Sequence, residues 1–194
     1  MKRRKIIKLA ALATGAALSA PLLSSLLSGC QSEAIDQADI NYKLQFLNKD
    51  EFALVRKLSN IILPKTDSPS ASDVGVHRMI DHMVATVYKK EDKEGYQKRF
   101  ASLVAYLNPD PEKVNSFLDL EEKEQLEMIQ KLSDAKEDNL KDAQEAFLDL
   151  RQQSIAYYLS SEEIGKKYLK YLPVPGEYQP CISLEEAGGK AWAL

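Results

Sequence analysis

Residues that commonly carry chemistry are scarce in this chain. Its 194 residues include two cysteines, two histidines and one tryptophan. Two cysteines cannot build a disulfide framework or a zinc site made of paired CxxC motifs. The sequence also lacks a GxGxxG, Walker, GxSxG or HExxH motif. Composition and motifs therefore point away from a self-sufficient enzyme.

Positive charge is scarce once the N-terminus is set aside. The first 29 residues hold five of the 26 basic residues and none of the 29 acidic ones, which leaves 165 residues with a formal charge of 21 − 29 = −8. Nucleic acids and anionic membrane surfaces are bound by basic patches, so we expect neither as a partner through charge. A chain of this size suits one domain with a single core.

The N-terminus has the layout of a bacterial export signal. Basic residues 1–8 precede an apolar run, residues 9–27, and Leu27-Ser28-Gly29-Cys30 resembles a lipobox. The alternative is a transmembrane helix, which needs about 20 strongly apolar residues. Ser, Thr, Gly and Pro dilute this run, so we expect residues 1–29 to be a signal peptide.

Cys30 would then be acylated and would begin the mature chain. Stable anchoring takes more than one acyl chain, and a multiply acylated cysteine meets that condition. We therefore expect a lipid-anchored protein on the periplasmic side of the bacterial envelope. Gln31, rather than Asp, follows the cysteine, which favours the outer membrane slightly over the inner one.

Arg3 and Arg4, followed by Lys5-Ile6-Ile7-Lys8, resemble a twin-arginine signal. That route exports folded proteins, whereas the ordinary alternative exports unfolded ones. A small chain without a cofactor has little need of it. A chain that escorts a folded, cofactor-loaded partner does need this route.

Cys181 is the second cysteine and has no partner within the mature chain. We expect a small buried hydrophobe here, with a free thiol or a bridge to another subunit as the alternative.

Periodicity predicts an all-α fold: a compact multi-helix domain with irregular loops rich in Pro and Gly, after the signal and a polar tether. The tether covers residues 30–48 and the domain covers residues 49–194. Apolar spacings of three and four residues predict the helices. They are a helix capped by Asp50 and stopped by Pro64, then Val76–Val87, Tyr96–Leu107, Val114–Leu118, Leu120–Leu132, Lys136–Leu159, and a short helix with a Ser160–Glu163 capping box that reaches Leu169.

Asp73, His77 and Asp81 are spaced four apart and share one stripe of a predicted helix. They predict either a divalent-metal site or a polar outer face. Of Tyr157 and Tyr158, we expect one in the core and the other free to stack on a partner or ligand.

Two loops are rich in turn residues. The first runs from Ile62 to Val76 and the second from Tyr171 to Tyr178. A stiff, extended segment loses little entropy on binding and suits packing along another protein. Packing of each loop against its own domain is the alternative.

These segments resemble the gluconate 2-dehydrogenase subunit 3 family. The resemblance runs from about Asp50 to Leu194 and includes the twin-arginine-like start. Its other motifs are Leu63-Pro64-x-Thr66-Asp67, Gly75-Val76, Gly165, Leu172-Pro173-Val174-Pro175-Gly176 and Ala191-Trp192. Pro69-Ser70-Ala71 stands where the family more often has Pro-Gly-Ala, and the lipobox at Cys30 is an addition to the family pattern.

The resemblance implies a non-catalytic subunit with no cofactor of its own. Its implied partner is a large FAD-containing flavoprotein of the glucose–methanol–choline type that oxidises a sugar or polyol, often with a cytochrome c subunit carrying haem c. The small subunit supplies the export signal. Its candidate partner interface is Pro64, Thr66, Asp67, Gly75, Pro173, Pro175, Gly176 and Tyr178, with Cys181 as an intersubunit thiol.

The leading hypothesis is therefore an accessory subunit that binds, escorts and anchors such a dehydrogenase. The alternatives are a free-standing lipoprotein that binds a ligand or peptide, and a metal-dependent enzyme that uses Asp73, His77 and Asp81.

Overall fold

The computed structural model describes residue 39 and residues 41–109, 116–174, 176–177, 181–186 and 188–193. The chain divides into two compact units, Met1–Asn41 and Tyr42–Leu194. The predicted signal, its Arg3 and Arg4, and Cys30 lie outside the described residues, as do Pro175 and Tyr178 of the predicted interface.

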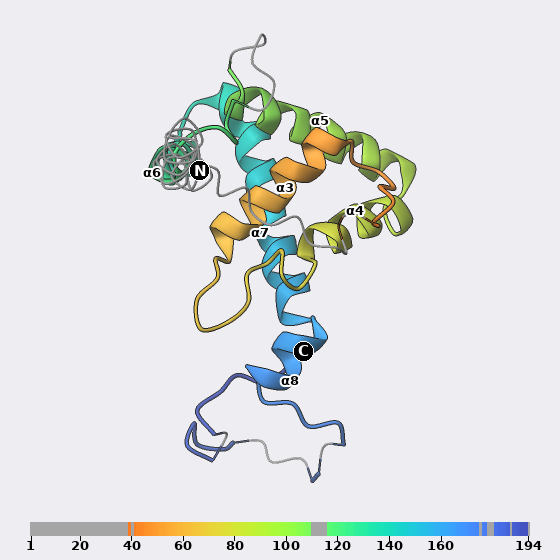
Figure 1. Cartoon of the computed structure of the whole chain (residues 1–194), viewed down its shortest axis with the longest axis vertical. Helices are drawn as coiled ribbons and strands as arrows, with labels where there is room; N and C mark the ends of the chain where they lie inside the picture. Colours follow the sequence, from red (N-terminus) through yellow and green to blue (C-terminus); the bar gives the residue numbers. More distant parts are fainter. Residues whose placement is uncertain are drawn as a thin grey trace, which may run out of the picture. The chain divides into compact units, whose positions relative to one another are not determined.

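The second unit is helical, and the described residues form no β-strand, which confirms the all-α fold (Figure 1). Its helices, numbered from α3, are α3 (Lys49–Ile62), α4 (Val76–Thr86), α5 (Lys90–Leu107), α6 (Glu122–Asp134), the 3₁₀ helix η1 (Asp138–Leu140), α7 (Lys141–Leu159) and α8 (Glu162–Lys167). Among the described residues, no helix combines the length and the apolar character needed to cross a bilayer.

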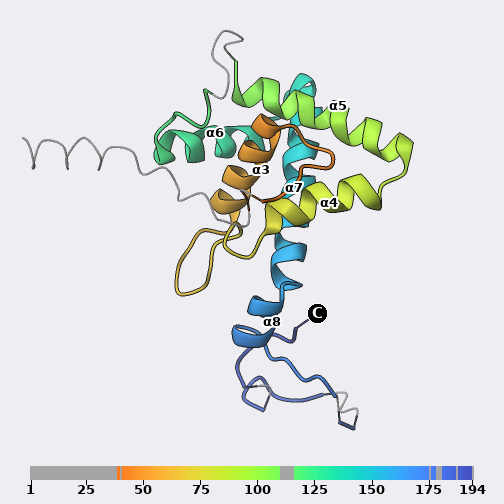
Figure 2. The same cartoon turned by 45° about the vertical axis from the view of Figure 1, so that its right-hand side comes forward.

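Helix α7 is the centre of the unit, since it contacts each of the other described helices. Its partners α3, α4, α5 and α6 surround its N-terminal part, whereas α8 continues from its C-terminal end (Figure 2). The side chains between these helices are buried and mostly apolar, and they include Leu54, Val55, Leu58, Val76, Ile80, Val84, Phe100, Leu103, Phe147 and Leu150. Because burial of each such side chain contributes about 1.5–3 kcal/mol, this core accounts for the packing of α3 to α7.

Several helix boundaries differ from the sequence predictions, and the largest shift at a helix start within α3 to α6 is that of α5, which begins at Lys90 and not at Tyr96. Asn48, not Asp50, caps α3: its side chain accepts a hydrogen bond from the Glu51 N–H, and the Glu51 carboxylate accepts one from the Asn48 N–H. The predicted Ser160–Glu163 capping box is wrong, because Ser160 ends α7 and donates to the Ala156 carbonyl. A 3₁₀ turn precedes α7, which begins later than expected. The described end of the predicted 114–118 helix is a turn.

The compact unit begins at Tyr42, earlier than the predicted boundary at residue 49. The carboxylate of Asp81, which is fully buried in α4, accepts hydrogen bonds from the N–H groups of Gln45 (2.8 Å), Phe46 (2.9 Å) and Leu47 (2.7 Å). It also accepts one from the Tyr42 hydroxyl, at 3.0 Å. Residues 42–48 were predicted to be tether, and the structure instead places them on the helical core.

Candidate partner-binding surface

The loop between α3 and α4, residues 63–75, is closed at its base by side chains. Asn60 of α3 both donates to the Ser72 hydroxyl (2.9 Å) and accepts from the Ser72 N–H (2.9 Å). The Ala71 N–H donates to the Leu63 carbonyl at 3.0 Å. Ala71 and Ser72 are buried as a result, so this half of the loop is packed against its own domain.

The turn that leads into α4 is held by Asp73 and Ser70. The Asp73 carboxylate accepts from the Ser70 N–H at 3.0 Å and lies 3.4 Å from the Lys65 ammonium. Partial burial raises the pKa of Asp73, but the hydrogen bonds from Ser70 and the Lys65 charge outweigh it and lower the pKa overall. Asp73 therefore stays ionised and stabilises the turn.

Gly75 closes the loop in a conformation that favours glycine. Its φ is +78°, and a Cβ at this position would lie 2.6 Å from a guanidinium nitrogen of Arg78. The residue is buried at the N-terminus of α4. Of the predicted interface residues in this loop, Gly75 thus shapes the backbone, whereas Pro64, Thr66 and Asp67 are exposed.

The hydroxyl groups of two tyrosines, one in α7 and one just after α8, form hydrogen bonds with this loop. The hydroxyl of Tyr158 in α7 contacts the Pro69 carbonyl (2.8 Å) and the Ser68 hydroxyl (3.0 Å). The hydroxyl of Tyr168, just after α8, donates to the Asp67 carbonyl at 3.1 Å. We call the exposed residues Pro64–Asp67 the loop tip.

Tyr158 is the core tyrosine of the predicted pair, and Tyr157 is half-buried and packs against the core.

The described residues after α8, within residues 168–193, form no helix or strand, and we call them the tail. The sequence predicted irregular structure after Tyr171, and α8 ends two residues before the predicted limit at Leu169. Lys170 and Trp192 form an isolated parallel bridge: the Lys170 N–H donates to the Ala191 carbonyl (2.7 Å), and the Ala193 N–H donates to the Lys170 carbonyl (2.9 Å). The Lys170 ammonium lies 4.5 Å from the centroid of the Trp192 ring. We call this pair of contacts the clasp, because it joins the two ends of the tail.

The described part of the tail is exposed almost throughout. Pro173 and Gly176 are exposed, and so is Cys181, so the prediction of a buried cysteine is wrong. The clasp could not be predicted from local sequence patterns, because 21 residues separate Lys170 from Trp192 along the chain.

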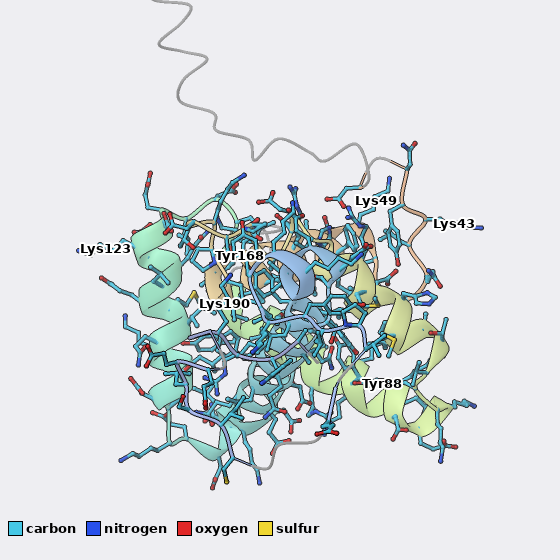
Figure 3. All side chains as sticks on the ribbon, turned by 90° about the horizontal axis from the view of Figure 1, so that it is seen from below. Lys43, Lys49, Tyr88, Lys123, Tyr168 and Lys190 are labelled. Atoms are coloured by element: carbon cyan, nitrogen blue, oxygen red, sulfur yellow. The ribbon has the colours of Figure 1, made fainter. Side chains whose placement is uncertain are left out.

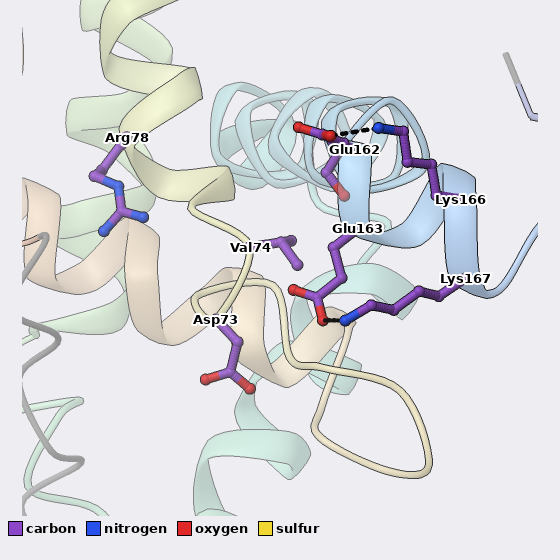
Figure 4. Close-up of a pocket in the computed structure, with 8 residues that line it drawn as sticks. Asp73, Val74, Arg78, Glu162, Glu163, Lys166 and Lys167 are labelled. Atoms are coloured by element: carbon purple, nitrogen blue, oxygen red, sulfur yellow. Dashed lines mark hydrogen bonds and ion pairs between the residues drawn. The ribbon is translucent and has the colours of Figure 1, made fainter. Parts of the chain in front are cut away.

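A hollow of about 440 Å³ lies between the loop and α8 (Figure 4). Its lining is Asp73, Val74, Arg78, Ser161, Glu162, Glu163, Lys166 and Lys167. Lys166 and Lys167 each form an ion pair with the glutamate four residues earlier, so the charges of α8 are neutralised in pairs. This arrangement is typical of a solvated helix face. Each of the three carboxylates of the lining is paired with a lysine: Asp73 with Lys65, Glu162 with Lys166 and Glu163 with Lys167.

The predicted stripe of Asp73, His77 and Asp81 does not form a metal site in the described chain. Asp73 precedes α4, His77 is fully buried with its ring edge against Phe52, and Asp81 holds residues 42–47. No group of three His, Cys, Asp or Glu side chains that could hold a metal ion exists among the described residues. The alternative of a polar outer face is also wrong, because two of the three side chains are buried.

Comparison with known proteins adds one finding. A family model described as gluconate 2-dehydrogenase subunit 3 matches residues 49–176. This range runs from the start of α3 through the loop, α7 and α8 into the first part of the tail. Neither a curated protein nor a solved structure matches the chain.

Proposed function

The chain belongs to the gluconate 2-dehydrogenase subunit 3 family, and on this premise we propose that it is the non-catalytic small subunit of an FAD-dependent sugar or polyol dehydrogenase. Family membership makes it an accessory subunit of a dehydrogenase complex. The finer proposal is that it binds the catalytic flavoprotein, escorts it through export and anchors it at the membrane. The family match over residues 49–176 is the observation that carries this proposal.

The N-terminal sequence supports the escort and the anchor. Arg3 and Arg4 fit a signal for folded cargo, and Cys30 fits a lipid attachment site. We propose that the folded flavoprotein, already loaded with FAD, crosses the inner membrane with this chain. The lipid on Cys30 then holds the complex at the periplasmic side of the envelope, at the outer membrane in preference to the inner one.

In this proposal the chemistry belongs to the partner chains. FAD bound in the flavoprotein would supply the oxidising group for the sugar or polyol, and haem c in a third, cytochrome subunit would serve as the electron acceptor. The residues of this chain supply surface. Such a subunit needs a packed body and exposed groups that contact the partner. The helical core provides the first, and the loop tip and the tail provide the second.

Co-purification from the native host tests the proposal. The full chain carries a C-terminal tag, is expressed at its normal level and is isolated in detergent. We expect an equimolar flavoprotein that releases FAD on denaturation and oxidises a sugar or polyol with a dye as acceptor. Isolation of a monodisperse monomer without any flavoprotein would contradict the proposal and favour the free-standing ligand-binding lipoprotein.

A further inference from the structure

The large apolar side chains that the structure leaves exposed are unevenly distributed. Among the described residues, five are scattered over the region from α4 to α7: Met79, Val87, Leu126, Leu148 and Ile155. Seven gather in the tail: Tyr168, Tyr171, Leu172, Val174, Ile182, Leu184 and Trp192. Single exposed apolar residues are ordinary on a protein surface, whereas a cluster of them marks a binding site.

Contacts between described residues hold the two ends of the tail together. The clasp joins its two ends, and the Lys190 ammonium donates to the Lys167 carbonyl at 3.4 Å. Inside the tail, the Glu186 carboxylate accepts from the N–H and hydroxyl groups of Ser183, which forms a local turn. A segment with fixed ends and internal turns loses less entropy on binding than an open chain end does.

A hydrogen bond joins the tail to the loop tip. Tyr168 belongs to the tail and donates to the Asp67 carbonyl of the loop tip. Figures 1 and 2 both draw the loop on the side of α7 where α8 and the tail lie, away from α5. The Lys190 ammonium donates to the carbonyl of Lys167, the residue before Tyr168, and Figure 3 draws the Tyr168 and Lys190 side chains near each other. The tail therefore contacts the loop tip through the hydroxyl of Tyr168.

The exposed area fits a subunit interface. With about 200 Å² for a whole side chain of this size, the seven tail residues expose roughly 700 Å² at their observed exposed fractions. A standard protein–protein interface buries about 800 Å² per partner. Tyr168, Tyr171 and Trp192 agree with such an interface, since tyrosine and tryptophan are enriched at interfaces and among their hot spots.

We propose that the tail and the loop tip together form the surface that docks the catalytic flavoprotein. This inference rests on the proposed function and assigns it to one face of the chain. A membrane fits this face less well than a protein does. The irregular backbone of the tail would leave unsatisfied polar groups in hydrocarbon, and Glu177, Glu185 and Glu186 would be repelled by anionic head groups.

A matched pair of variants tests the assignment. Leu172 in the tail is 50% exposed and Leu126 on α6 is 48% exposed, so Leu172→Asp and Leu126→Asp make the same change at equal exposure. Val174→Asp, at a residue 79% exposed, is a second tail variant. Each tagged full-length chain is expressed in the native host, and FAD released per mole of tagged chain is measured after purification.

We expect Leu172→Asp and Val174→Asp to reduce the recovered FAD at least about tenfold, because an aspartate buried in an apolar contact loses its hydration. Leu126→Asp should retain the wild-type amount. Far-ultraviolet circular dichroism should show unchanged helix content in all three, since each side chain is exposed.

Wild-type recovery of FAD in both tail variants would overturn the assignment and leave the proposed function intact. Absence of FAD from the wild-type preparation would overturn the proposed function itself. If the tail variants keep FAD but lose binding to vesicles of anionic lipid, the tail is a membrane contact. If they keep FAD but convert a dimer of this chain to a monomer, the tail is a contact between copies. Either result contradicts the inference.

Discussion

The helical core and the tail use apolar residues in opposite ways. In the core, side chains such as Leu103 and Leu150 are buried by neighbouring helices of the same chain. In the tail, Leu172 and Leu184 remain exposed, although hydrogen bonds fix the ends of the segment. The first pattern stabilises the fold, and the second leaves surface that another molecule can cover. This chain without catalytic motifs thus has one region whose apolar side chains are covered by its own helices and one region whose apolar side chains stay exposed.

Leucine truncation should give the largest contrast between the two regions. Leu103→Ala removes a fully buried side chain of α5, and we expect a loss of about 3 kcal/mol in the free energy of unfolding. That corresponds to a fall in Tm of about 10 °C. Leu172→Ala should change the free energy by less than about 0.5 kcal/mol. Thermal denaturation measures both, and equal effects would remove the distinction between core and tail.

The Asp81→Asn variant tests whether the contact between residues 42–47 and the core contributes to stability. An amide in place of the carboxylate cannot accept all four hydrogen bonds and puts an NH₂ group against a backbone N–H donor. We expect a loss of about 2–3 kcal/mol in the free energy of unfolding. Asp119→Asn, at an exposed residue, is the control and should stay within about 0.5 kcal/mol of wild type. Denaturant titration measures both. If the two variants are equally stable, residues 42–47 are a tether and do not belong with the core.

Gly75→Ala tests the turn that joins the loop to the core. The positive φ and the contact with Arg78 should destabilise the protein by about 1–2 kcal/mol. Gly95→Ala in α5 has room for a methyl group at 3.6 Å from Arg99 and should stabilise by about 0.5–1 kcal/mol. Urea midpoints measure both changes in stability, which should have opposite signs. A stabilised Gly75→Ala variant would mean that this turn is not constrained.

Tyr42 should make the N-terminal contact sensitive to high pH. Burial first, and then the hydrogen bond and the charge of Asp81, raise the pKa of Tyr42 to about 12 from an ordinary value of 10.0. A pKa raised by folding means that the stabilisation is complete below pH 10.0 and is lost as the pH rises through about 12.

The matching variant is Tyr42→Phe, which should be about 1 kcal/mol less stable than wild type at pH 8. Urea unfolding at intervals from pH 8 to pH 12 should show this difference shrinking at the alkaline end. A difference that does not vary with pH would show that the hydroxyl proton contributes nothing to the contact.

Trp192→Ala should have the smallest effect on stability and a distinct effect on the tail. It removes the ring beneath the Lys170 ammonium, an exposed cation–π contact worth about 0.5–1 kcal/mol locally. We expect an unchanged Tm but faster cleavage by trypsin at Lys170 or Lys190. Trp192→Phe keeps an aromatic ring and is the control, with cleavage close to that of the wild type. Unchanged cleavage would show that the clasp does not order the tail.

Helical periodicity predicted the helices from α3 to α7 well, because each buries one apolar stripe. Helix ends were less predictable, since Asn48 and Asp50 are both good caps and only the surrounding structure chose Asn48. The exposed state of Cys181 was missed because small apolar character does not reveal which segments stay outside the core. The pairing of Asp81 with residues 42–47 and of Lys170 with Trp192 depends on tertiary contacts that no local pattern encodes.

The site was predicted in part. Pro64, Thr66, Asp67, Pro173 and Gly176 were named from the sequence, and the structure leaves all five exposed. What the sequence did not reveal is that Tyr158 of α7 and Tyr168, just after α8, hold the first loop through the carbonyls of Pro69 and Asp67. Their role in partner binding stays a prediction, and so does that of the exposed Cys181 as an intersubunit thiol.

Separation of the subunits tests the central claim most directly. The complex isolated from the native host is dissociated, each chain is purified, and oxidation of sugars and polyols is followed with a dye as electron acceptor. We predict that all activity and all FAD remain with the flavoprotein, and that this chain alone shows neither. Turnover of a sugar or polyol by this chain in the absence of flavin would contradict the account.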